Sequence, residues 1–199
     1  GEIVDFKMQF KNRGSVPVRL KELINLKPQV GDVYEFSPTS TATPRLSDFK
    51  IKYKCSTITT YPNGTTANYR YSNQPVSMSI FNGSTPIWQS ICDSETTNWF
   101  DIEFPGSGQL INPGNSVEII YSGIVTGSSG QIAKNSFSYK ATEEDINIPF
   151  GSEISNTVVI TNNGEGCNPL PPCFDCSSFD LIKKSKYLVS AWVKEEDPL

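Results

Sequence analysis

The run from Leu110 to Ile160 limits the possible folds more than any other part of the chain. It holds three segments of similar length, near Ser116–Val125, Gln131–Ala141 and Glu153–Ile160, separated by a Gly/Ser turn and an acidic turn. Each segment mixes apolar residues with Ser, Thr and Asn, as expected of a strand with one face in a core and one in water. We therefore predict three strands here.

The residues before this run repeat the pattern at shorter lengths. With 14 Gly, 14 Pro and only 37% hydrophobic residues, the composition favours many short strands over long helices. Val18–Leu26 also has helix-compatible spacing, but we favour a strand because turn signals flank it and no convincing cap precedes it. Such regular strands predict an all-β fold, an antiparallel β-sandwich. The further strands expected are Glu2–Phe10, Val18–Ile24, Asp32–Phe36, Phe49–Cys55, Ala67–Tyr71, Val76–Phe81 and Asn98–Phe104.

The composition changes after residue 161. Thr161–Pro172 is dominated by turn formers, and Tyr187–Lys194 then alternates again like a strand. We predict a sandwich over residues 1–161, a Pro/Gly/Cys linker over 162–176 and the beginning of a second β domain over 177–199. The chain opens on a strand-like segment and ends soon after another, so we expect a piece or processed form of a longer protein.

The composition also argues against several classes of function. The chain has no histidine, which removes Ser-His-Asp and Cys-His catalysis, His-ligated metal sites and histidine pH switches. Its net charge of -4 does not indicate the basic surface that is typical of nucleic-acid-binding proteins. No paired carboxylates or phosphate loop stand out, and no segment approaches the roughly 20 apolar residues that span a bilayer. We therefore expect no enzymatic activity, cofactor, bound metal, nucleic-acid partner or transmembrane segment.

Four short motifs lie at strand ends in residues 1–161. In the motif Asn112-Pro113-Gly114, Pro113 fixes φ at the first central position of a turn and Gly114 supplies a positive φ at the next. Together the motifs resemble DUF11-type conserved-repeat domains, and this resemblance implies an immunoglobulin-like sandwich. They are Asn12-Arg13-Gly14 after a strand, Asn112-Pro113-Gly114 before Ser116-Val117-Glu118-Ile119, Asn135 at the opening of a strand, and Ser155-Asn156-Thr157-Val158 in the last strand.

A fifth motif, Lys186–Lys194 (KYLVSAWVK), is similar to a strand of carbohydrate-binding-like jelly rolls in large secreted proteins of Bacteroidota. The two resemblances imply a large modular secreted or cell-surface protein, such as an adhesin or a type IX secretion substrate. The implied partners are other β domains of the same polypeptide, a surface glycan, or a secretion or outer-membrane complex. The function expected is a structural or adhesive module; the alternatives are a carbohydrate-binding module and a cargo or accessory subunit of a secretion machine.

The five cysteines suggest disulfides. Cys55 and Cys92 both fall within the predicted sandwich, and a bond between them is the simplest arrangement in an exported protein. In the later cluster, a disulfide of Cys167 with Cys173 or Cys176 is favoured over zinc or free thiols, since zinc takes four ligands and no histidine is present. The odd count leaves one cysteine over.

Two further groups of residues are candidate ligand contacts. Trp88 and Tyr61 could stack on sugar rings, although most aromatic residues of a sandwich belong to its core, which is where we expect Trp99. The acidic loops Glu143-Glu144-Asp145 and Asp93-Ser94-Glu95 could bind Ca²⁺, but neither has the spacing of a calcium loop, so solvated loops are favoured.

Overall fold

The structure is a computed structural model that describes residues 3–36, 41–62, 64–80, 85–143, 149–155, 157–162 and 187–195. Side chains are not described at residues 57, 61, 149–154 and 187–195. The described residues form strands and loops and contain no helix, which confirms the all-β prediction. The strands are β1 Ile3–Asn12, β2 Val18–Leu26, β3 Ile51–Tyr61, β4 Asn68–Ser72, β5 Trp99–Glu103, β6 Gln109–Ile111, β7 Ser116–Val125, β8 Ile132–Asn135, β9 Ser138–Glu143, β10 Pro149–Ile154, β11 Val158–Thr161 and β12 Tyr187–Glu195.

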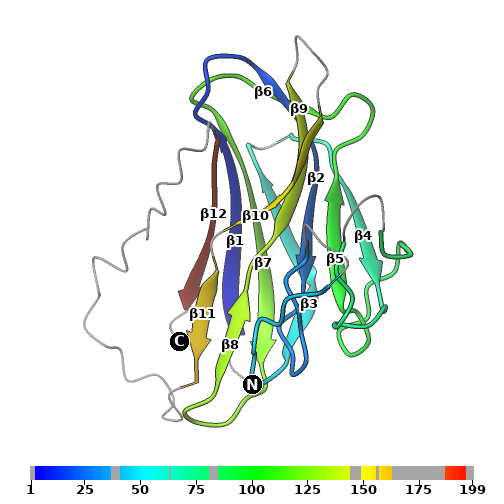
Figure 1. The fold of residues 1–199 in the computed structure, drawn as a ribbon, viewed down its shortest axis with the longest axis vertical. Coiled ribbons are helices and arrows are strands. Elements are labelled where there is room, and N and C mark those ends of the chain that lie inside the picture. Colours follow the sequence, from blue (N-terminus) through cyan, green and yellow to red (C-terminus); the bar gives the residue numbers. More distant parts are fainter. Residues whose placement is uncertain are drawn as a thin grey trace, which may run out of the picture.

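Two large sheets lie face to face and form a β-sandwich (Figure 1). The four-stranded sheet has the order β12-β1-β7-β3, and the six-stranded sheet has the order β10-β9-β2-β5-β4, with β6 paired to β2 in line with β5. A small third sheet joins β11 and β8. All pairs of named strands are antiparallel, as the sequence predicts.

The main core lies between the two large sheets and is rich in aromatic side chains. β1 alternates strictly between half-buried and buried residues, so that every second side chain, including Phe6, enters this core. The Phe6 ring stacks on Tyr121 of β7 with their centroids 5.0 Å apart, and Phe100 of β5 packs against Tyr121 and Tyr53 at 5.6 and 5.8 Å. The Phe100 contacts join strands of opposite sheets, whereas the Phe6–Tyr121 stack joins neighbouring strands of one sheet. Both kinds of contact add to the stabilisation from burial alone.

β2 is buried on both of its faces, which explains why its sequence also fits a helix. A bulge between Leu20 and Glu22 shifts the alternation by one residue. Leu20 and Leu23 therefore both enter the main core, while Ile24 and later Leu26 face outward. The outward side chains form a second apolar cluster with Trp99, so Trp99 is a core residue as predicted. The other buried members of this second cluster are Val33, Val76 and Ile80.

Two predicted strands are absent from the described residues because their segments cover the second cluster instead. Asp32–Phe36 and the described part of Val76–Phe81 make only isolated bridges, between Val33 and Pro44 and between Phe36 and Ile80. Their apolar residues are buried against the outer face of the six-stranded sheet, which produces the same alternation as a strand. The prediction of two strands here is therefore wrong.

Two of the three strands predicted after Leu110 are each divided in two. Ser116–Val125 is a single strand with the predicted bounds, but Gln131–Ala141 forms β8 and β9 in different sheets. The break falls at two consecutive buried polar residues, Asn135 and Ser136, which cannot both face the same core in a regular strand. Asn135 thus ends a strand and does not open one. The predicted Glu153–Ile160 is likewise divided into β10 and β11.

The last strand joins the first sheet. The alternation of Tyr187–Lys194 predicts a strand, and β12 is one. The start of a second domain over residues 177–199 stays a prediction. β12 pairs with β1 from Val4 opposite Glu195 to Asn12 opposite Tyr187 and forms an edge of the four-stranded sheet. The predicted linker, at residues 162–176, lies almost wholly outside the described residues.

Asn12 holds two turns together at the upper end of the sandwich. Its buried side chain donates to the main-chain oxygens of Val16 and Ile111, at 2.8 and 2.9 Å, and accepts from Gly14 N at 2.9 Å. The Asn12 main chain also bonds to the Asn-Pro-Gly turn, where Gly114 has the expected positive φ of 84°. The two motifs that seemed independent in the sequence therefore form one structural unit.

Replacing Asn12 with Ala should destabilise the fold by about 2 kcal/mol, because it leaves buried main-chain groups without partners. Urea unfolding monitored by tryptophan fluorescence measures this change. Asn115→Ala is the control, because the side chain removed is exposed and the same turn keeps its backbone. Equal stability of Asn12→Ala and the wild type would contradict this role.

Candidate functional site

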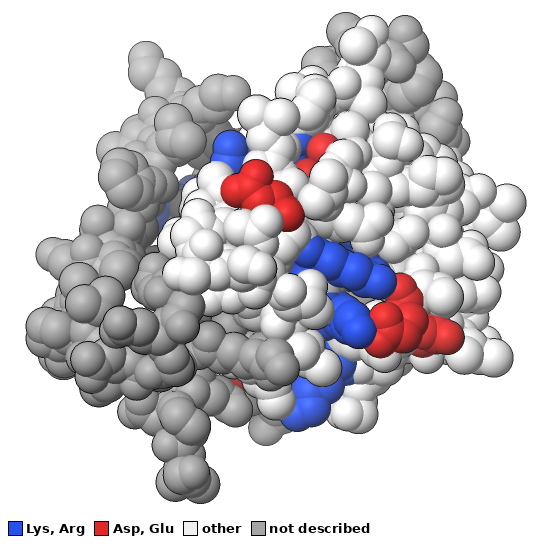
Figure 2. Space-filling view, turned by 90° about the horizontal axis from the view of Figure 1, so that it is seen from below, with Lys and Arg blue, Asp and Glu red and all other residues white. Residues whose placement is uncertain are grey.

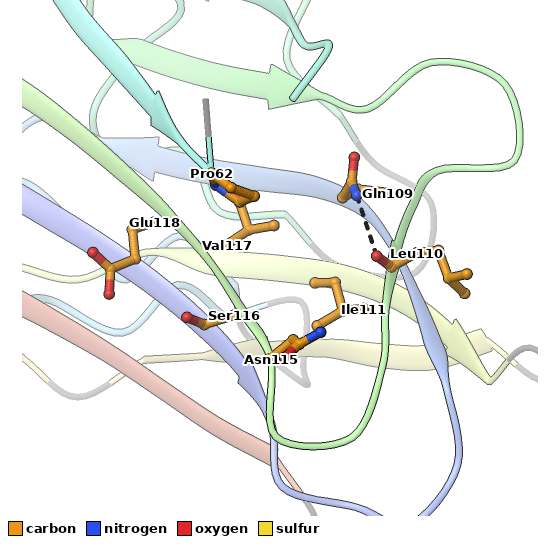
Figure 3. Close-up of a pocket in the computed structure, with 8 residues that line it drawn as sticks. All are labelled: Pro62, Gln109, Leu110, Ile111, Asn115, Ser116, Val117 and Glu118. Carbon is orange, nitrogen blue, oxygen red and sulfur yellow. Dashed lines mark hydrogen bonds between the residues drawn. The ribbon is translucent and has the colours of Figure 1, made fainter. Parts of the chain in front are cut away.

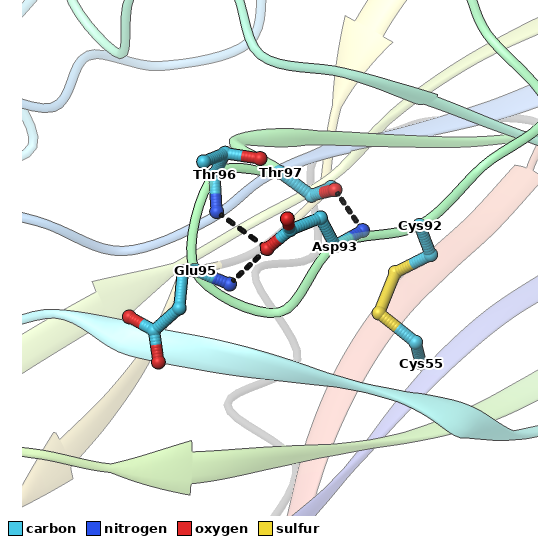
Figure 4. Close-up of a disulfide and its surroundings, with 6 residues drawn as sticks. All are labelled: Cys55, Cys92, Asp93, Glu95, Thr96 and Thr97. Carbon is cyan, nitrogen blue, oxygen red and sulfur yellow. Dashed lines mark hydrogen bonds between the residues drawn. A yellow bond between two sulfur atoms is a disulfide. The ribbon is translucent and has the colours of Figure 1, made fainter.

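A disulfide joins a strand of the four-stranded sheet to the loop between β4 and β5. Cys55 of β3 is bonded to Cys92 in the loop before β5, which confirms the pairing expected from the sequence (Figure 4). Next to it, the turn Asp93–Thr97 is fixed by its own side chains. Asp93 Oδ1 accepts hydrogen bonds from the backbone nitrogens of Glu95 and Thr96, at 2.8 and 3.2 Å, and these bonds lower the pKa of Asp93. This arrangement gives the predicted acidic loop a structural role.

A fully buried ion cluster lies beneath the second apolar cluster. Arg45 is 1% exposed, and its guanidinium is 2.9 Å from both Asp32 Oδ2 and Glu35 Oε1, whose side chains are also fully buried. The guanidinium further donates to the Leu26 main-chain oxygen at 2.7 Å. Burial raises the pKa of Glu35, while Arg45 and a hydrogen bond from Ser136 oppose this shift.

This cluster fixes the long segment 27–50 to the sandwich. Asp32 also accepts from Ser47 Oγ at 2.7 Å, and Ser47 Oγ in turn accepts from Lys134 N in β8 at 3.0 Å. Leu46, between two buried neighbours, has a φ of 64° and is 67% exposed. A leucine adopts this strained conformation only where its surroundings impose it, and here both adjacent side chains are held by Asp32.

A second charged group occupies the outer face of the six-stranded sheet. Arg70 of β4 donates to Asp101 at 2.6 Å, to Glu103 at 3.0 Å and to Glu22 at 2.9 Å. The ring of Trp88 lies over the guanidinium, with the central carbon 5.4 Å from the ring centroid. Burial, reinforced by the Glu22 charge, raises the pKa of Asp101 to about 7. Arg70 thus crosslinks β2, β4 and β5.

The structure places the remaining predicted residues as follows. Trp88 is half-buried and packs against the second apolar cluster as well as Arg70. Tyr61 ends β3, and its side chain is not described. No described contact therefore brings the two residues together as a platform for a sugar ring. A sugar-binding role for either residue stays a prediction. Cys167, Cys173 and Cys176 lie outside the described residues, as do Glu144 and Asp145.

Three lysines and two acidic residues meet at the lower end, and we call Lys27, Lys50, Lys52, Asp93 and Glu95 the basal cluster. Figure 2 views this end and shows basic side chains gathered beside acidic ones. Lys52 Nζ lies 2.5 Å from Glu95 Oε1, and Lys50 Nζ donates to the Glu95 main-chain oxygen at 2.7 Å. Both lysines are about one-third exposed.

Lys27 differs from the other members of the basal cluster because its side chain is completely buried. Its Nζ finds no hydrogen-bond acceptor among the described residues. Burial, followed by the charge of nearby Lys50, lowers the pKa of Lys27 to about 7. A buried amino group without an acceptor is costly to keep charged, which distinguishes Lys27 from the paired guanidinium groups of Arg45 and Arg70.

An open depression of about 570 Å³ lies at the opposite, upper end, between β6 and the start of β7 (Figure 3). Glu118 is the one carboxylate among the described residues that line the depression. It already forms an ion pair with Lys7 and accepts a hydrogen bond from Gln9. The depression therefore offers apolar, amide and hydroxyl groups and, within its described lining, no unengaged carboxylate. Its lining residues are Pro62, Gln109, Leu110, Ile111, Asn115, Ser116, Val117 and Glu118.

Neither a metal centre nor a membrane span is found in the part of the chain that the structure describes. No three acidic or cysteine side chains there are grouped so that they could hold a metal ion. The same residues include no helix with the length and apolar character needed to cross a bilayer.

The fold defines an all-β sandwich protein crosslinked by a disulfide and containing buried ion pairs. Comparison with known proteins adds no family to this description: no family model, curated protein or solved structure matches the chain. The function must therefore be inferred from the residues themselves.

The sequence analysis missed the residues with the most unusual environments, Arg45, Arg70 and Lys27. None of the three is among the residues for which the sequence predicts a role, because charged residues are rarely buried. A local signal is present for Arg45: it follows a Pro-rich loop and is flanked by Pro44 and Leu46, while Asp32 and Glu35 flank Val33 and Tyr34 nearby. Both acidic residues fall within the predicted strand Asp32–Phe36.

Replacing Arg45 with Met should cost about 3–5 kcal/mol, because it leaves two buried carboxylates without their cation. The triple variant Asp32→Asn, Glu35→Gln, Arg45→Met should recover part of this loss, since no uncompensated charge remains. Chemical denaturation of both variants measures the difference. A triple variant as unstable as the single one would show that hydrogen-bond geometry, and not charge, dominates.

The stability of the protein relative to Lys27→Met should rise between pH 7 and 10. The folded pKa of Lys27, about 7, lies below its ordinary value of 10.5, so the unfolded chain binds more protons in this interval. One pKa unit corresponds to about 1.4 kcal/mol, which predicts a change of a few kcal/mol across the interval. Urea unfolding of both proteins as a function of pH measures it; a constant difference would contradict the burial argument.

Proposed function

We propose that this chain is a non-catalytic structural or adhesive module of a larger secreted or cell-surface bacterial protein. The observation that carries the proposal is the Cys55–Cys92 disulfide between β3 and the loop before β5. Disulfides of this kind persist in oxidising compartments and are rare in the cytosol. The DUF11-type and jelly-roll resemblances of the sequence point in the same direction.

The internal crosslinks suit a module that transmits load or keeps other domains apart. The disulfide, the Arg45 cluster and the Arg70 group each tie together segments far apart in the sequence. The ionisable side chains of the last two groups pair with one another, which fixes their positions within the scaffold. Ligand recognition by such a module would fall to its loops.

Export can be tested directly in the organism that produces the protein. Intact cells are labelled with a membrane-impermeant amine reagent, and the labelled lysines are identified by mass spectrometry. Surface display predicts labelling of the exposed lysines without lysis, together with Cys55 and Cys92 protected from alkylation until a reductant is added. Labelling only after lysis, with both cysteines alkylated at once, would rule the proposal out.

The disulfide should also matter for stability. The cysteines are 37 residues apart, and the chain-entropy account then predicts about 4 kcal/mol of stabilisation. The double variant Cys55→Ala, Cys92→Ala should lose up to this amount in chemical denaturation. A reduced wild type that behaves like the double variant controls for packing changes at the two sites.

A further inference from the structure

Among the described residues, four buried side-chain atoms have no hydrogen-bond partner: Glu22 Oε2, Lys27 Nζ, Asp101 Oδ1 and Ser138 Oγ. The two carboxylates are nevertheless neutralised, because Arg70 contacts both and Lys140 lies 2.8 Å from Glu22. Ser138 is uncharged. Of the three ionisable side chains in this set, Lys27 is thus the one without an ion pair among the described residues.

The acidic residues near Lys27 do not supply its missing acceptor. Asp93 uses Oδ1 to fix the turn, through the backbone nitrogens of Glu95 and Thr96. The Glu95 carboxylate lies against Lys52, with its second oxygen 3.9 Å from Lys50. One carboxylate therefore serves two lysines, and the third amino group is left over.

We propose that the basal cluster is a binding site for an oxyanion, in which the three lysine amino groups bind a sulfate, phosphate or carboxylate group in place of the Glu95 carboxylate. Several convergent ammonium groups are a common way to bind such groups, and each contact is a charge-assisted hydrogen bond. A bound oxyanion gives Lys27 the acceptor that the protein itself does not provide.

The geometry allows Glu95 to leave without disturbing the fold. Its side chain is 60% exposed, so it can move into solvent. The backbone of its turn stays in place, because Thr97 N donates to Asp93 O at 2.8 Å and Asp93 N donates to Thr97 Oγ1 at 3.0 Å. The disulfide at Cys92 adjoins this turn (Figure 4). Glu95 acts in this view as an internal competitor of the ligand.

This site would also depend on pH. An oxyanion binds the charged form of Lys27, so its affinity should increase as pH falls through the pKa of about 7. The charged groups that influence Lys27 are Lys50, Lys52 and Glu95, and Lys27 in turn influences Asp93. The two acidic residues have pKa values lowered below their ordinary ranges, so neither changes charge near pH 7.

The test is a titration of the folded protein with sodium sulfate, sodium phosphate and a sulfated disaccharide, at constant ionic strength maintained with sodium chloride. NMR signals of the lysine ε-methylene groups report binding. We expect saturable shifts at Lys27, Lys50 and Lys52. Lys27→Met should reduce the affinity about tenfold or more, and Glu95→Gln should increase it. Both the wild type and each variant are checked for native chemical shifts elsewhere.

Lys7→Gln is the matched control, because Lys7 is also partly exposed and ion-paired with a glutamate, Glu118, on other strands. It should leave the affinity unchanged. Tighter binding of the disaccharide than of sulfate identifies an acidic glycan as the ligand source, and equal binding identifies the bare oxyanion; both support the site. No saturable shift at Lys27, or equal affinity in Lys27→Met, would overturn the proposal. It does not rest on export, so its failure leaves the proposed function untouched.

Discussion

The buried contact of Arg45 with Asp32 and Glu35 is the interaction on which the rest of the architecture depends. The six-stranded sheet presents apolar residues on both faces, and its outer face needs a cover. The cover consists of segments with little regular structure, whose main-chain groups cannot be satisfied by a sheet. Arg45 connects these segments to Leu26 of β2, and Ser136 connects Glu35 to the β8–β9 junction. Without these charges, the segments that cover the second apolar cluster would have no fixed position.

A buried ion pair of this kind is not efficient as a source of stability. Removing charges from water costs several kcal/mol per ion, and hydrophobic replacements are often as stable. Its value here lies in geometry, because a guanidinium has several donors in fixed directions and so defines the path of segment 27–50. The strained backbone of Leu46 is consistent with this: the side chains on either side are placed first, and the intervening residue adapts.

The sequence predicted those parts of the fold in which alternation reflects burial on one face. β7 has the predicted bounds because its neighbours on both sides are strands and only one face enters the core. The prediction failed for Asp32–Phe36, where the alternation came from an irregular segment lying on a sheet, and at Asn135 and Ser136, where polar side chains are buried. Alternation cannot distinguish these cases, since it reports burial and not hydrogen-bond pairing. The disulfide was predictable from the cysteines, but nothing in the sequence indicated that Lys27 is buried.

The charged groups of the scaffold have partners within the protein, whereas the central charged group of the candidate site has none among the described residues. Arg45 and Arg70 are each surrounded by carboxylates and acceptors, so adding a ligand there would break contacts without making better ones. Lys27 is in the opposite situation. Folding buries its amino group, which is unfavourable, and the described part of the protein supplies no acceptor that compensates for this. A ligand that provides the acceptor recovers part of that cost. Since the turn carrying Glu95 is held by contacts independent of its carboxylate, ligand exchange at this point need not propagate into the sandwich. A rigid scaffold with one exchangeable counter-ion at its end is the arrangement expected of a module that recognises its ligand without changing shape.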